Sequence, residues 1–322
     1  MNAAPIADPE TLQQAIEYFA DEGRCHAYMV RQRWPNGVTC PTCGSAKIGF
    51  ISTRRVFECR AEQKHPKRQF TVKKGTIFED SPVPLKSWLL ATWMIVNCKN
   101  GVSSYEISRN IGVTQKATWH MMHRIRLAMQ AANGGKIGGE IEVDETFIGG
   151  KARNMHRDRK ARTISGRGMN GKAAVMGLLQ RHPGKGKSRV RLEVIPNTRR
   201  NQLHSRVEKH VEDGSTVYTD ALKSYNNLGI YFEHGVIDHA ERYVDGNVHT
   251  NGMENFWSLL KRSIKGTYVS VEPFHLFRYL DEQARRFNER ELTDGQRFRQ
   301  TLSAVTGKRL TWNAVTGKEA EA

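Results

Sequence analysis

The sequence predicts a multidomain chain of mixed α+β and α/β class, in which two small N-terminal blocks precede a larger domain of alternating strands and helices. Three observations lead to this prediction. Cysteines cluster in a turn-rich segment before residue 80, and residues 84–130 follow a helical pattern of apolar spacing. After a glycine-rich linker at 131–139, strand-like segments alternate with helical ones. With 322 residues, the chain is long enough for two or three domains of about 100–200 residues each.

The charge balance indicates the class of partner. The chain carries 50 Lys and Arg against 33 Asp and Glu, a net charge of +17. Such an excess repels itself in the folded state and is typical of a protein that binds a polyanion, so a nucleic acid is favoured over a merely basic housekeeping role. No stretch approaches the roughly 18 apolar residues of a membrane span, and the N-terminus has no signal-peptide pattern. We therefore expect no membrane association and a cytoplasmic location.

The first block, residues 1–80, combines a helix predicted at 10–31 with strands predicted at 48–51, 56–59 and 69–72. Cys40 and Cys43 form a CxxC pair, fifteen residues then precede Cys59, and five more precede His65. Two such pairs complete the tetrahedron of a structural Zn²⁺ site, and the ion replaces the hydrophobic core that so small a block lacks. The alternative is a reduced, metal-free CxxC. The spacing favours zinc, with His65 in place of a second CxxC.

The two remaining cysteines fit a different role. Cys25 and Cys98 each lie in a helical pattern among apolar neighbours, so we expect them to be core thiols. An odd total of five cysteines, in a chain without a signal peptide, argues against a disulfide framework.

The second block, residues 81–132, has the pattern of a helix-turn-helix. Helices are predicted at 85–99, at 103–111 with Ser103 or Ser104 as its cap, and at 115–129 after a turn at Gly112. The last helix would present polar side chains suited to base edges and phosphates: Gln115, Lys116, Thr118, His120 and Arg124. The alternative is an ordinary three-helix packing module. The net charge favours DNA binding.

The third block, residues 139–292, alternates strands and helices. Strands are predicted at 140–148, 173–179, 190–195, 216–220 and 231–237, and helices at 201–211, 251–264 and 273–288. A basic, glycine-containing segment at 151–172, which begins with Lys151, is predicted to be a mobile loop that grips the DNA backbone. Residues 293–322 are predicted to form a C-terminal tail, weakly structured after Gly307.

Three acids of this block lie at positions suited to metal binding. Asp144 is in the middle of a strand, Asp220 ends a strand, and Glu254 is in the first turn of a helix. Carboxylates so placed can converge on two Mg²⁺ or Mn²⁺ ions, roughly 3.5–4 Å apart, that clamp an in-line displacement at phosphorus. Lys261, two helical turns beyond Glu254, and the adjacent Arg262 would hold a phosphate.

Each acid also has a structural explanation. Asp220 could cap the following turn, and Glu254 could pair with an exposed lysine. Asp144 is the hardest to explain in this way, because a charge inside a strand is costly unless it is paired or bound to metal. From the residues alone, a catalytic triad and three unrelated structural acids stay open.

The chain resembles an ISXO-like transposase (insertion-sequence family 1595) of the DDE superfamily, with an N-terminal zinc ribbon. The resemblance covers about residues 33–290. It is carried by these motifs: Arg33-Trp-Pro-Asn-Gly-Val-Thr-Cys-Pro-Thr-Cys-Gly-Ser, Gly75-Thr-Ile-Phe-Glu-Asp-Ser, Val143-Asp-Glu-Thr-Phe-Ile-Gly-Gly-Lys, Tyr218-Thr-Asp, His249-Thr-Asn-Gly-Met-Glu-Asn-Phe-Trp-Ser-Leu-Leu-Lys-Arg and Arg286-Phe-Asn-Glu-Arg.

This resemblance implies a ribonuclease-H-like catalytic domain with Asp144 and Asp220 as its two aspartates. Relatives use either glutamate or asparagine at the third position; Glu254 is preferred over Asn251 because it keeps the usual spacing to Lys261. The resemblance also implies Mg²⁺-dependent cleavage at the terminal inverted repeats of the element, and strand transfer into a target duplex. It implies a bacterial protein, associated with the nucleoid when bound to DNA, that acts as a homodimer or higher oligomer.

Two other functions stay open at this point. A zinc-ribbon, helix-turn-helix transcription regulator with an inert third domain would not need Asp144. A ribonuclease-H-like nuclease would cut DNA without joining it. The acids at strand positions favour an enzyme over a regulator.

Overall fold

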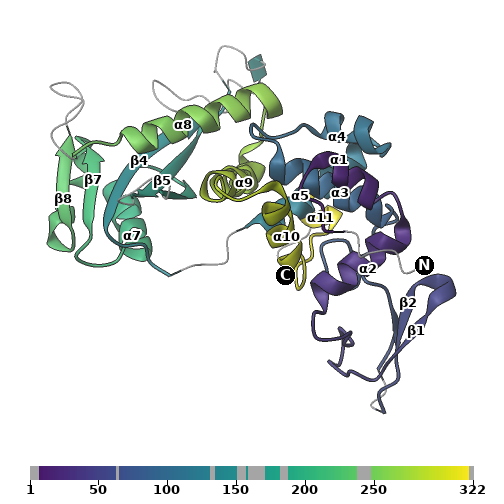
Figure 1. The fold of residues 1–322 in the computed structure, drawn as a ribbon. Helices are drawn as coiled ribbons and strands as arrows, with labels where there is room; N and C mark the ends of the chain where they lie inside the picture. Colours follow the sequence, from purple (N-terminus) through teal and green to yellow (C-terminus); the bar gives the residue numbers. More distant parts are fainter. Residues whose placement is uncertain are drawn as a thin grey trace. The chain divides into compact units, whose positions relative to one another are not determined.

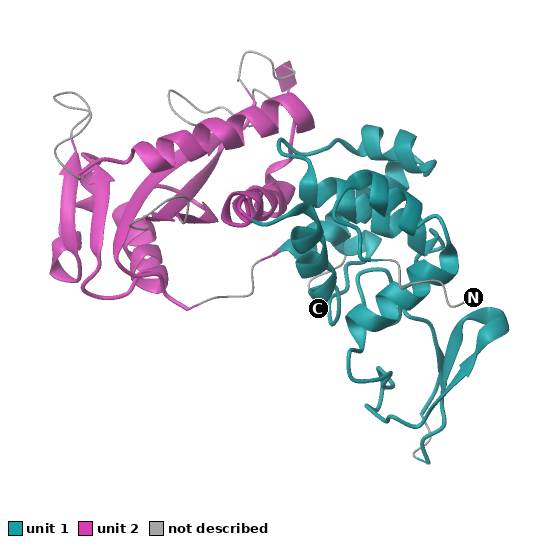
Figure 2. Cartoon of the chain, viewed as in Figure 1, with its two compact units in different colours: residues 1–129, 292–322 teal, residues 130–291 magenta. Residues whose placement is uncertain are grey.

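The computed structural model describes residues 7–62, 65–130, 135–150, 157–158, 171–181, 188–237 and 248–318. The chain divides into two compact units (Figure 2). Unit 1 contains Met1–Met129 and Leu292–Ala322, and unit 2 contains Gln130–Glu291. None of the described helices is long and apolar enough to cross a membrane.

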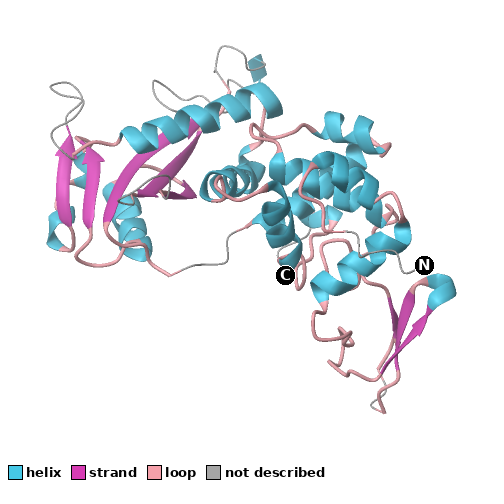
Figure 3. Cartoon of the chain, in the orientation of Figure 1, coloured by secondary structure: helices cyan, strands magenta, loops and turns pink. Residues whose placement is uncertain are grey.

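A three-stranded antiparallel sheet forms the ribbon of unit 1. The strands are β1 (Ile48–Ile51), β2 (Val56–Cys59) and β3 (Gln69–Phe70), in the order β1-β2-β3 (Figure 3). All three were predicted, although β3 ends two residues early. Phe57, Phe70 and the partly buried Trp34 pack beside two of the buried cysteines in a small cluster of their own, and this apolar contact is too limited to replace a full core.

The N-terminal helical segment is broken, so the prediction of one helix at 10–31 was wrong. Helix α1 (Leu12–Tyr18) ends before Phe19, and α2 (Glu22–Arg33) begins anew after Asp21. The Asp21 carboxylate accepts a hydrogen bond of 2.7 Å from the backbone N–H of Arg24. An aspartate in extended conformation that caps a new first turn explains the break.

The helices of the second block agree closely with the prediction. They are α3 (Leu85–Asn97), α4 (Ser104–Ile111) and α5 (Gln115–Met129). Ser103 is the N-cap of α4 and accepts from the N–H of Glu106. Gly112 has φ of 67°, a left-handed conformation that glycine adopts without a steric penalty, and turns the chain from α4 into α5.

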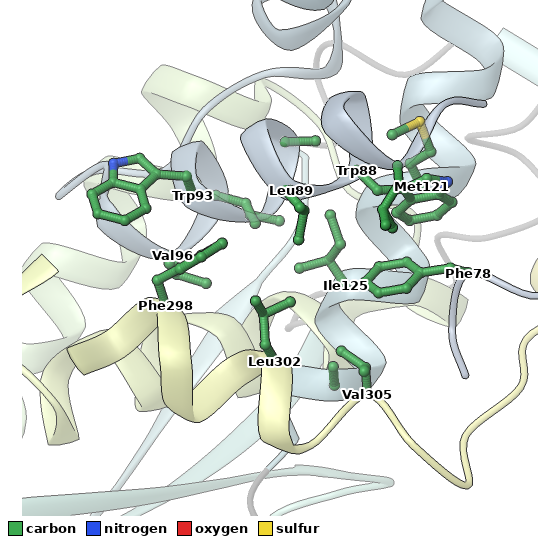
Figure 4. Packing of buried hydrophobic residues seen from close by; sticks show 14 of the residues in the cluster. Phe78, Trp88, Leu89, Trp93, Val96, Met121, Ile125, Phe298, Leu302 and Val305 are labelled. Atoms are coloured by element: carbon green, nitrogen blue, oxygen red, sulfur yellow. The ribbon is translucent and has the colours of Figure 1, made fainter. Parts of the chain in front are cut away.

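The C-terminal segment is part of unit 1, which corrects the prediction of a separate tail at 293–322. Helix α10 (Asp294–Ser303) buries Phe298 and Leu302, and α11 (Trp312–Thr316) buries Val315. Figure 4 shows Phe298 facing Trp93 and Leu302 lying between α10 and the helices of the core. The reason is packing: apolar side chains on α10 complete a core that α3 and α5 leave open on one side.

Unit 2 contains one five-stranded sheet of order β6-β5-β4-β7-β8. Strands β4 (Glu140–Ile148), β5 (Ala173–Gln180) and β6 (Arg189–Ile195) are antiparallel neighbours. Strands β7 (Thr216–Asp220) and β8 (Glu233–Ile237) extend the sheet in parallel to β4. All five strands were predicted within two residues of their bounds, and β4 is central.

Helices cover both faces of this sheet. Helix α7 (Arg200–His210) packs Leu203 and Val207 on one face, in a cluster that includes Ile141 and Val143 of β4. Helix α8 (Asn251–Ser263) runs along β4 and β5 on the other face, and α9 (Leu276–Asn288) contacts β6 (Figure 1). The alternation of side chains along β4 thus sends its odd positions toward α7 and its even positions, 142 and 144, toward α8.

Candidate active site and metal centre

The predicted zinc ligands come together in unit 1. One ligand atom each from Cys40, Cys43, Cys59 and His65 lies within 4.8 Å of all the others. The Cys40 Sγ to His65 Nε2 distance is 3.4 Å, and the Cys43 Sγ to Cys59 Sγ distance is 3.6 Å. Ligands bound to a tetrahedral Zn²⁺ are about 3.5–3.8 Å apart. The residues present therefore fit zinc, and Cys59, the last residue of β2, connects the cluster to the ribbon strands.

Local hydrogen bonds favour the thiolate form of Cys40 in this cluster. Burial acts to raise the pKa of Cys40, but the backbone N–H groups of Cys43 and Thr42 favour its thiolate and bring the pKa down to about 7. The Pro66 carbonyl and the neighbouring thiolates raise the pKa of His65. The thiolate is the form that binds zinc. Cys25, by contrast, is fully buried, and burial raises the pKa of its thiol to about 12, as expected of a core thiol.

The first two acids lie side by side in the sheet of unit 2. Parallel strands β4 and β7 pair Glu140 with Thr216 and Glu142 with Tyr218. The same register, continued two residues along, sets Asp144 opposite Asp220. Partners in register point to the same face of a parallel sheet, so both carboxylates face the α8 side. The Asp220 carboxylate also accepts a hydrogen bond of 3.2 Å from the N–H of Leu222. This is the contact expected if Asp220 caps the following turn, which was the structural alternative to a metal ligand.

The third acid lies on α8, over the same face. Glu254 and Asn251 are both exposed in the first turn of this helix, Lys261 is half-buried two turns on, and Arg262 is exposed. The charges of Asp220 and Glu254 both act on Asp144, so the three acids share one electrostatic environment. The carboxylates of these three acids do not lie as close together as the four predicted zinc ligands. Among the described residues, the cysteine cluster is the only group of possible metal ligands that is so compact.

Asp144 is held by two hydrogen bonds. Its Oδ1 accepts from the backbone N–H of Glu145 at 2.8 Å, and its Oδ2 accepts from the indole Nε1 of Trp257 at 2.9 Å. Burial is the main cause that raises its pKa to about 6, and the charges of Asp220 and Glu254 add to this, while the two hydrogen bonds oppose it. Burial likewise raises the pKa of Glu145 to about 9, with the charges of Asp144 and Asp220 as further causes. Raised pKa values with causes of this kind are found more often at functional sites than elsewhere.

A second buried acid fastens α8 to the sheet. Glu142 is 1% exposed and accepts from the backbone N–H of Met253, in the first turn of α8, at 2.8 Å. Its other oxygen accepts from Arg181 Nε at 2.6 Å, and Arg181 also donates to the His249 carbonyl at 2.6 Å. Because Glu142 and Asp144 point to the same face of β4, one strand anchors the helix and carries the central aspartate.

The predicted DNA-contacting face of α5 is only partly exposed. Lys116 is exposed, and Gln115 is half-buried with its amide donating to Ser104 at 2.9 Å. Thr118 and Arg124 are 0% and 6% exposed, so their prediction as outward-facing side chains was wrong. The reason for Arg124 is local packing: its guanidinium donates to the Glu79 carbonyl at 2.6 Å and lies over the Trp88 ring. Lys151 and most of the basic segment 151–172 lie outside the described residues.

Sequence reasoning missed three residues of the acidic site: Glu142, Arg181 and Trp257. Two of them carried a signal. Glu142 lies two residues before Asp144 and so shares its face of the strand, and Trp257 lies one helical turn after Glu254. Arg181 follows the end of β5 and had no such signal, because its partner Glu142 is far away in sequence.

Comparison with known proteins agrees with this architecture. Residues 20–64 match the transposase zinc-ribbon domain, and residues 136–288 match the ISXO2-like transposase domain. The chain is similar to an uncharacterized protein in the transposable element ISH50 of Halobacterium salinarum, at 28% identity, over 77% of this chain and 84% of that protein. It is also similar to an uncharacterized transposase-like protein of Haemophilus influenzae, at 32% identity, over 33% of this chain and 86% of that protein. A transposase zinc-ribbon domain is thus followed by a mixed α/β domain that matches the ISXO2-like transposases. The chain therefore belongs to the ISXO2-like insertion-sequence transposases.

Proposed function

We propose that this protein catalyses metal-dependent cleavage of DNA at the terminal inverted repeats of its element, and transfer of the cut strand into a target duplex. Asp144, Asp220 and Glu254 would be the acidic residues of the site. The observation that carries the proposal is the register of β4 and β7, which sets Asp144 opposite Asp220 beneath the helix that bears Glu254.

The sheet supports a ribonuclease-H-like fold for this domain. Three antiparallel strands are extended by two strands parallel to the central one, and helices cover both faces. The acids lie on the central strand, on its parallel neighbour and on a helix over one face. This arrangement matches the fold that the family resemblance implies.

The donor set suits Mg²⁺ or Mn²⁺. All three side chains are hard carboxylates, and the raised pKa of Asp144 shows a buried acid that a cation would stabilise in its charged form. When bound, such ions activate the attacking oxygen and neutralise charge at the leaving oxygen. The chain itself contributes the position of the acids, and Lys261 and Arg262 on the same helix would hold a phosphate of the DNA backbone.

The reaction has two displacements at phosphorus. In the first, water attacks the scissile phosphate and frees a 3′-hydroxyl on the end of the element. In the second, that hydroxyl attacks a phosphate of the target strand and displaces the 3′-oxygen of the adjacent target nucleotide, which leaves as a free 3′-hydroxyl. Catalysis of this kind consists mainly of positioning and electrostatic stabilisation, which is what acids on a rigid sheet and helix supply.

The DNA contacts fall on unit 1 and on the basic residues of unit 2. The ribbon and the α4–α5 pair would recognise the inverted repeats, with Gln115 and Lys116 at the accessible first turn of α5. Lys151 would add contacts to the backbone. Two ends must be brought together for transfer, so we propose that the protein acts as a homodimer or a higher oligomer on DNA.

The test is strand cleavage and joining with a labelled duplex of the inverted repeat that flanks the coding sequence, in Mg²⁺. We expect the parent protein to cut and join, and Asp144→Asn and Glu254→Gln to bind the duplex without cutting it. If Glu254→Gln stays active while Asn251→Ala does not, Asn251 holds the third position.

Two outcomes would replace this function. Full activity of Asp144→Asn would contradict catalysis at this site, and specific binding without cleavage by the parent would favour a transcription regulator. Cleavage of a duplex that carries a free 3′-hydroxyl, with no joined product, would identify a nuclease.

A further inference from the structure

One tryptophan connects the two elements that carry the acids. Trp257 is 4% exposed on α8, and its indole N–H reaches across to Asp144 on β4, 113 residues away in sequence. Glu254 lies three residues before it, one turn earlier on the same helix. This hydrogen bond therefore connects α8, which carries Glu254, to Asp144 on β4.

The neighbouring strand makes room for this contact. Gly177 on β5 is the partner of Asp144 in the antiparallel pair. A Cβ atom at this position would lie 2.7 Å and 2.8 Å from two carbons of the Trp257 ring, and 2.2 Å from the Met253 methyl group. Ordinary carbon contacts are about 3.5–4.0 Å. A glycine in the middle of a strand is unfavourable in itself, so its presence here is explained by the close approach of the ring.

The two hydrogen bonds also fix the orientation of the Asp144 carboxylate. One oxygen accepts from a backbone N–H of its own strand and the other from the indole. A carboxylate offers about four acceptor positions, so each oxygen keeps one for a cation. The indole hydrogen bond decides in which direction those positions point.

We propose that Trp257 is a positioning residue, which orients Asp144 for a divalent cation and keeps Glu254 in register with it. The inference rests on the proposed function, since it assigns Trp257 a role in the same site. Residues that orient a metal ligand typically change metal affinity or activity by about 10–100-fold when they are replaced.

The direct test is binding of Mn²⁺ to the zinc-loaded protein, measured from the loss of the free Mn²⁺ signal in electron paramagnetic resonance. Trp257→Phe keeps an aromatic ring but removes the N–H donor. We expect it to weaken Mn²⁺ binding about 10-fold or more and to raise by a similar factor the Mg²⁺ concentration needed for half-maximal strand cleavage. Trp93→Phe, the same change at a tryptophan that is 1% exposed in the core of unit 1, is the matched control and should leave both values unchanged.

Gly177→Ala tests the same contact from the other strand. Its new methyl group must displace the indole, so we expect the weaker Mn²⁺ binding of Trp257→Phe without any change in the acids. Equal Mn²⁺ affinity in the parent and Trp257→Phe would overturn the positioning role, even if the variant melted at a lower temperature. If the parent itself bound no Mn²⁺, and Asp144→Asn changed nothing, the proposed function would fail instead.

Discussion

The acidic residues of unit 2 show how position alters a side chain of ordinary type. Asp144 and Asp220 differ little in sequence context, since each lies in or at the end of an apolar strand. In the fold, burial and two neighbouring acids raise the pKa of Asp144 to about 6. When carboxylates lie close together without a cation between them, their repulsion lowers the free energy of unfolding.

Burial of the Asp144 carboxylate, together with this repulsion, predicts a more stable variant. The pKa of Asp144 rises from 3.8 to about 6 on folding. Between these values the folded protein binds more protons than the unfolded chain, so the free energy of unfolding falls as the pH rises through this range. At about 1.4 kcal/mol per pKa unit, the loss approaches about 3 kcal/mol above pH 6. We expect zinc-loaded Asp144→Asn, without Mg²⁺ or Mn²⁺, to melt at a higher temperature than the parent at pH 8.

The pH dependence separates this cause from a general effect of the substitution. The difference in melting temperature between the parent and Asp144→Asn should shrink as the pH is lowered toward 4. At that pH the Asp144 carboxyl of the folded parent is protonated and, like the asparagine amide, uncharged. A difference that stayed constant between pH 4 and pH 8 would show that the charge of Asp144 is not the cause.

Residue-level prediction from the sequence used local signals. The four predicted zinc ligands do lie together in the structure, whereas the roles of Asp144 and Asp220 stay predictions that rest on their positions in their strands. Thr118 and Arg124 were placed wrongly, because the side chains that bury Arg124 come from elements before α5. Trp257 was missed for the same reason, as its partner lies across the sheet.

At the scale of the element, we expect the ribbon to depend on a zinc ion held by the cysteine cluster. Its strands have two to four residues each, and its apolar cluster is small. Structural zinc contributes folding free energy outright, and a ribbon of this size lacks another source. The cysteine cluster therefore holds β1, β2 and the CxxC turn together.

Removal of zinc should unfold the ribbon locally. We expect Cys59→Ser, or treatment with a strong chelator, to release one zinc per chain and to make residues near 40–70 accessible to protease, while unit 2 stays folded. Cys25 is the internal control: its buried thiol should resist alkylation at pH 8 in both states of the ribbon. Rapid alkylation of Cys25 after chelation would show that unfolding spreads into the helices.

Helix α8 depends on a buried ion pair at its first turn. Glu142→Gln would break the close pair of Glu142 with the half-buried Arg181 and leave Glu140, at 3.9 Å, as a weaker acidic neighbour of Arg181. Breaking a fully buried pair costs about 3–5 kcal/mol, so we expect a loss of about 3 kcal/mol or less here. We expect urea unfolding to show a loss of this size, and the double change Glu142→Gln with Arg181→Met to recover part of it. The exposed pair Lys136–Asp213 is the control, for which Asp213→Asn should cost less than about 1 kcal/mol.

The bounds of helices and strands were predictable where a capping residue or a turn residue in the sequence indicates the end of the element. Ser103 and Gly112 delimit α4 by a cap and a turn, and both were read from the sequence. The cap at Asp21 was overlooked, although the segment Asp21-Glu-Gly-Arg interrupts the apolar spacing between Ala20 and Cys25. The order of the strands was beyond the sequence, since β4 joins β7 across an intervening helix and two strands.

At the scale of the whole molecule, the N-terminal and C-terminal segments of the chain fold together in unit 1. Unit 1 is closed by α10, which packs on α2, α3 and α5. Glu10 accepts from Arg299 at 2.7 Å, so the first and last helical segments are joined directly. Unit 2 is thus an insertion between two parts of one folded body. The composition of residues 293–322 did not indicate that they belong to unit 1, because this segment has only a few more apolar side chains than an unstructured tail would have.

If the units are independent folding bodies, two matched core deletions should act separately. Leu302 in unit 1 and Leu280 in unit 2 are 2% and 1% exposed, and replacing a buried leucine by alanine costs about 2–5 kcal/mol. We expect two transitions in calorimetry, with Leu302→Ala lowering only the one that also responds to zinc, and Leu280→Ala lowering only the other. A single transition lowered by both substitutions would mean that the units unfold together. In the first outcome, α10 would join the residues after the insertion to the rest of unit 1, so that loss of the last thirty residues would unfold unit 1 and leave unit 2 folded.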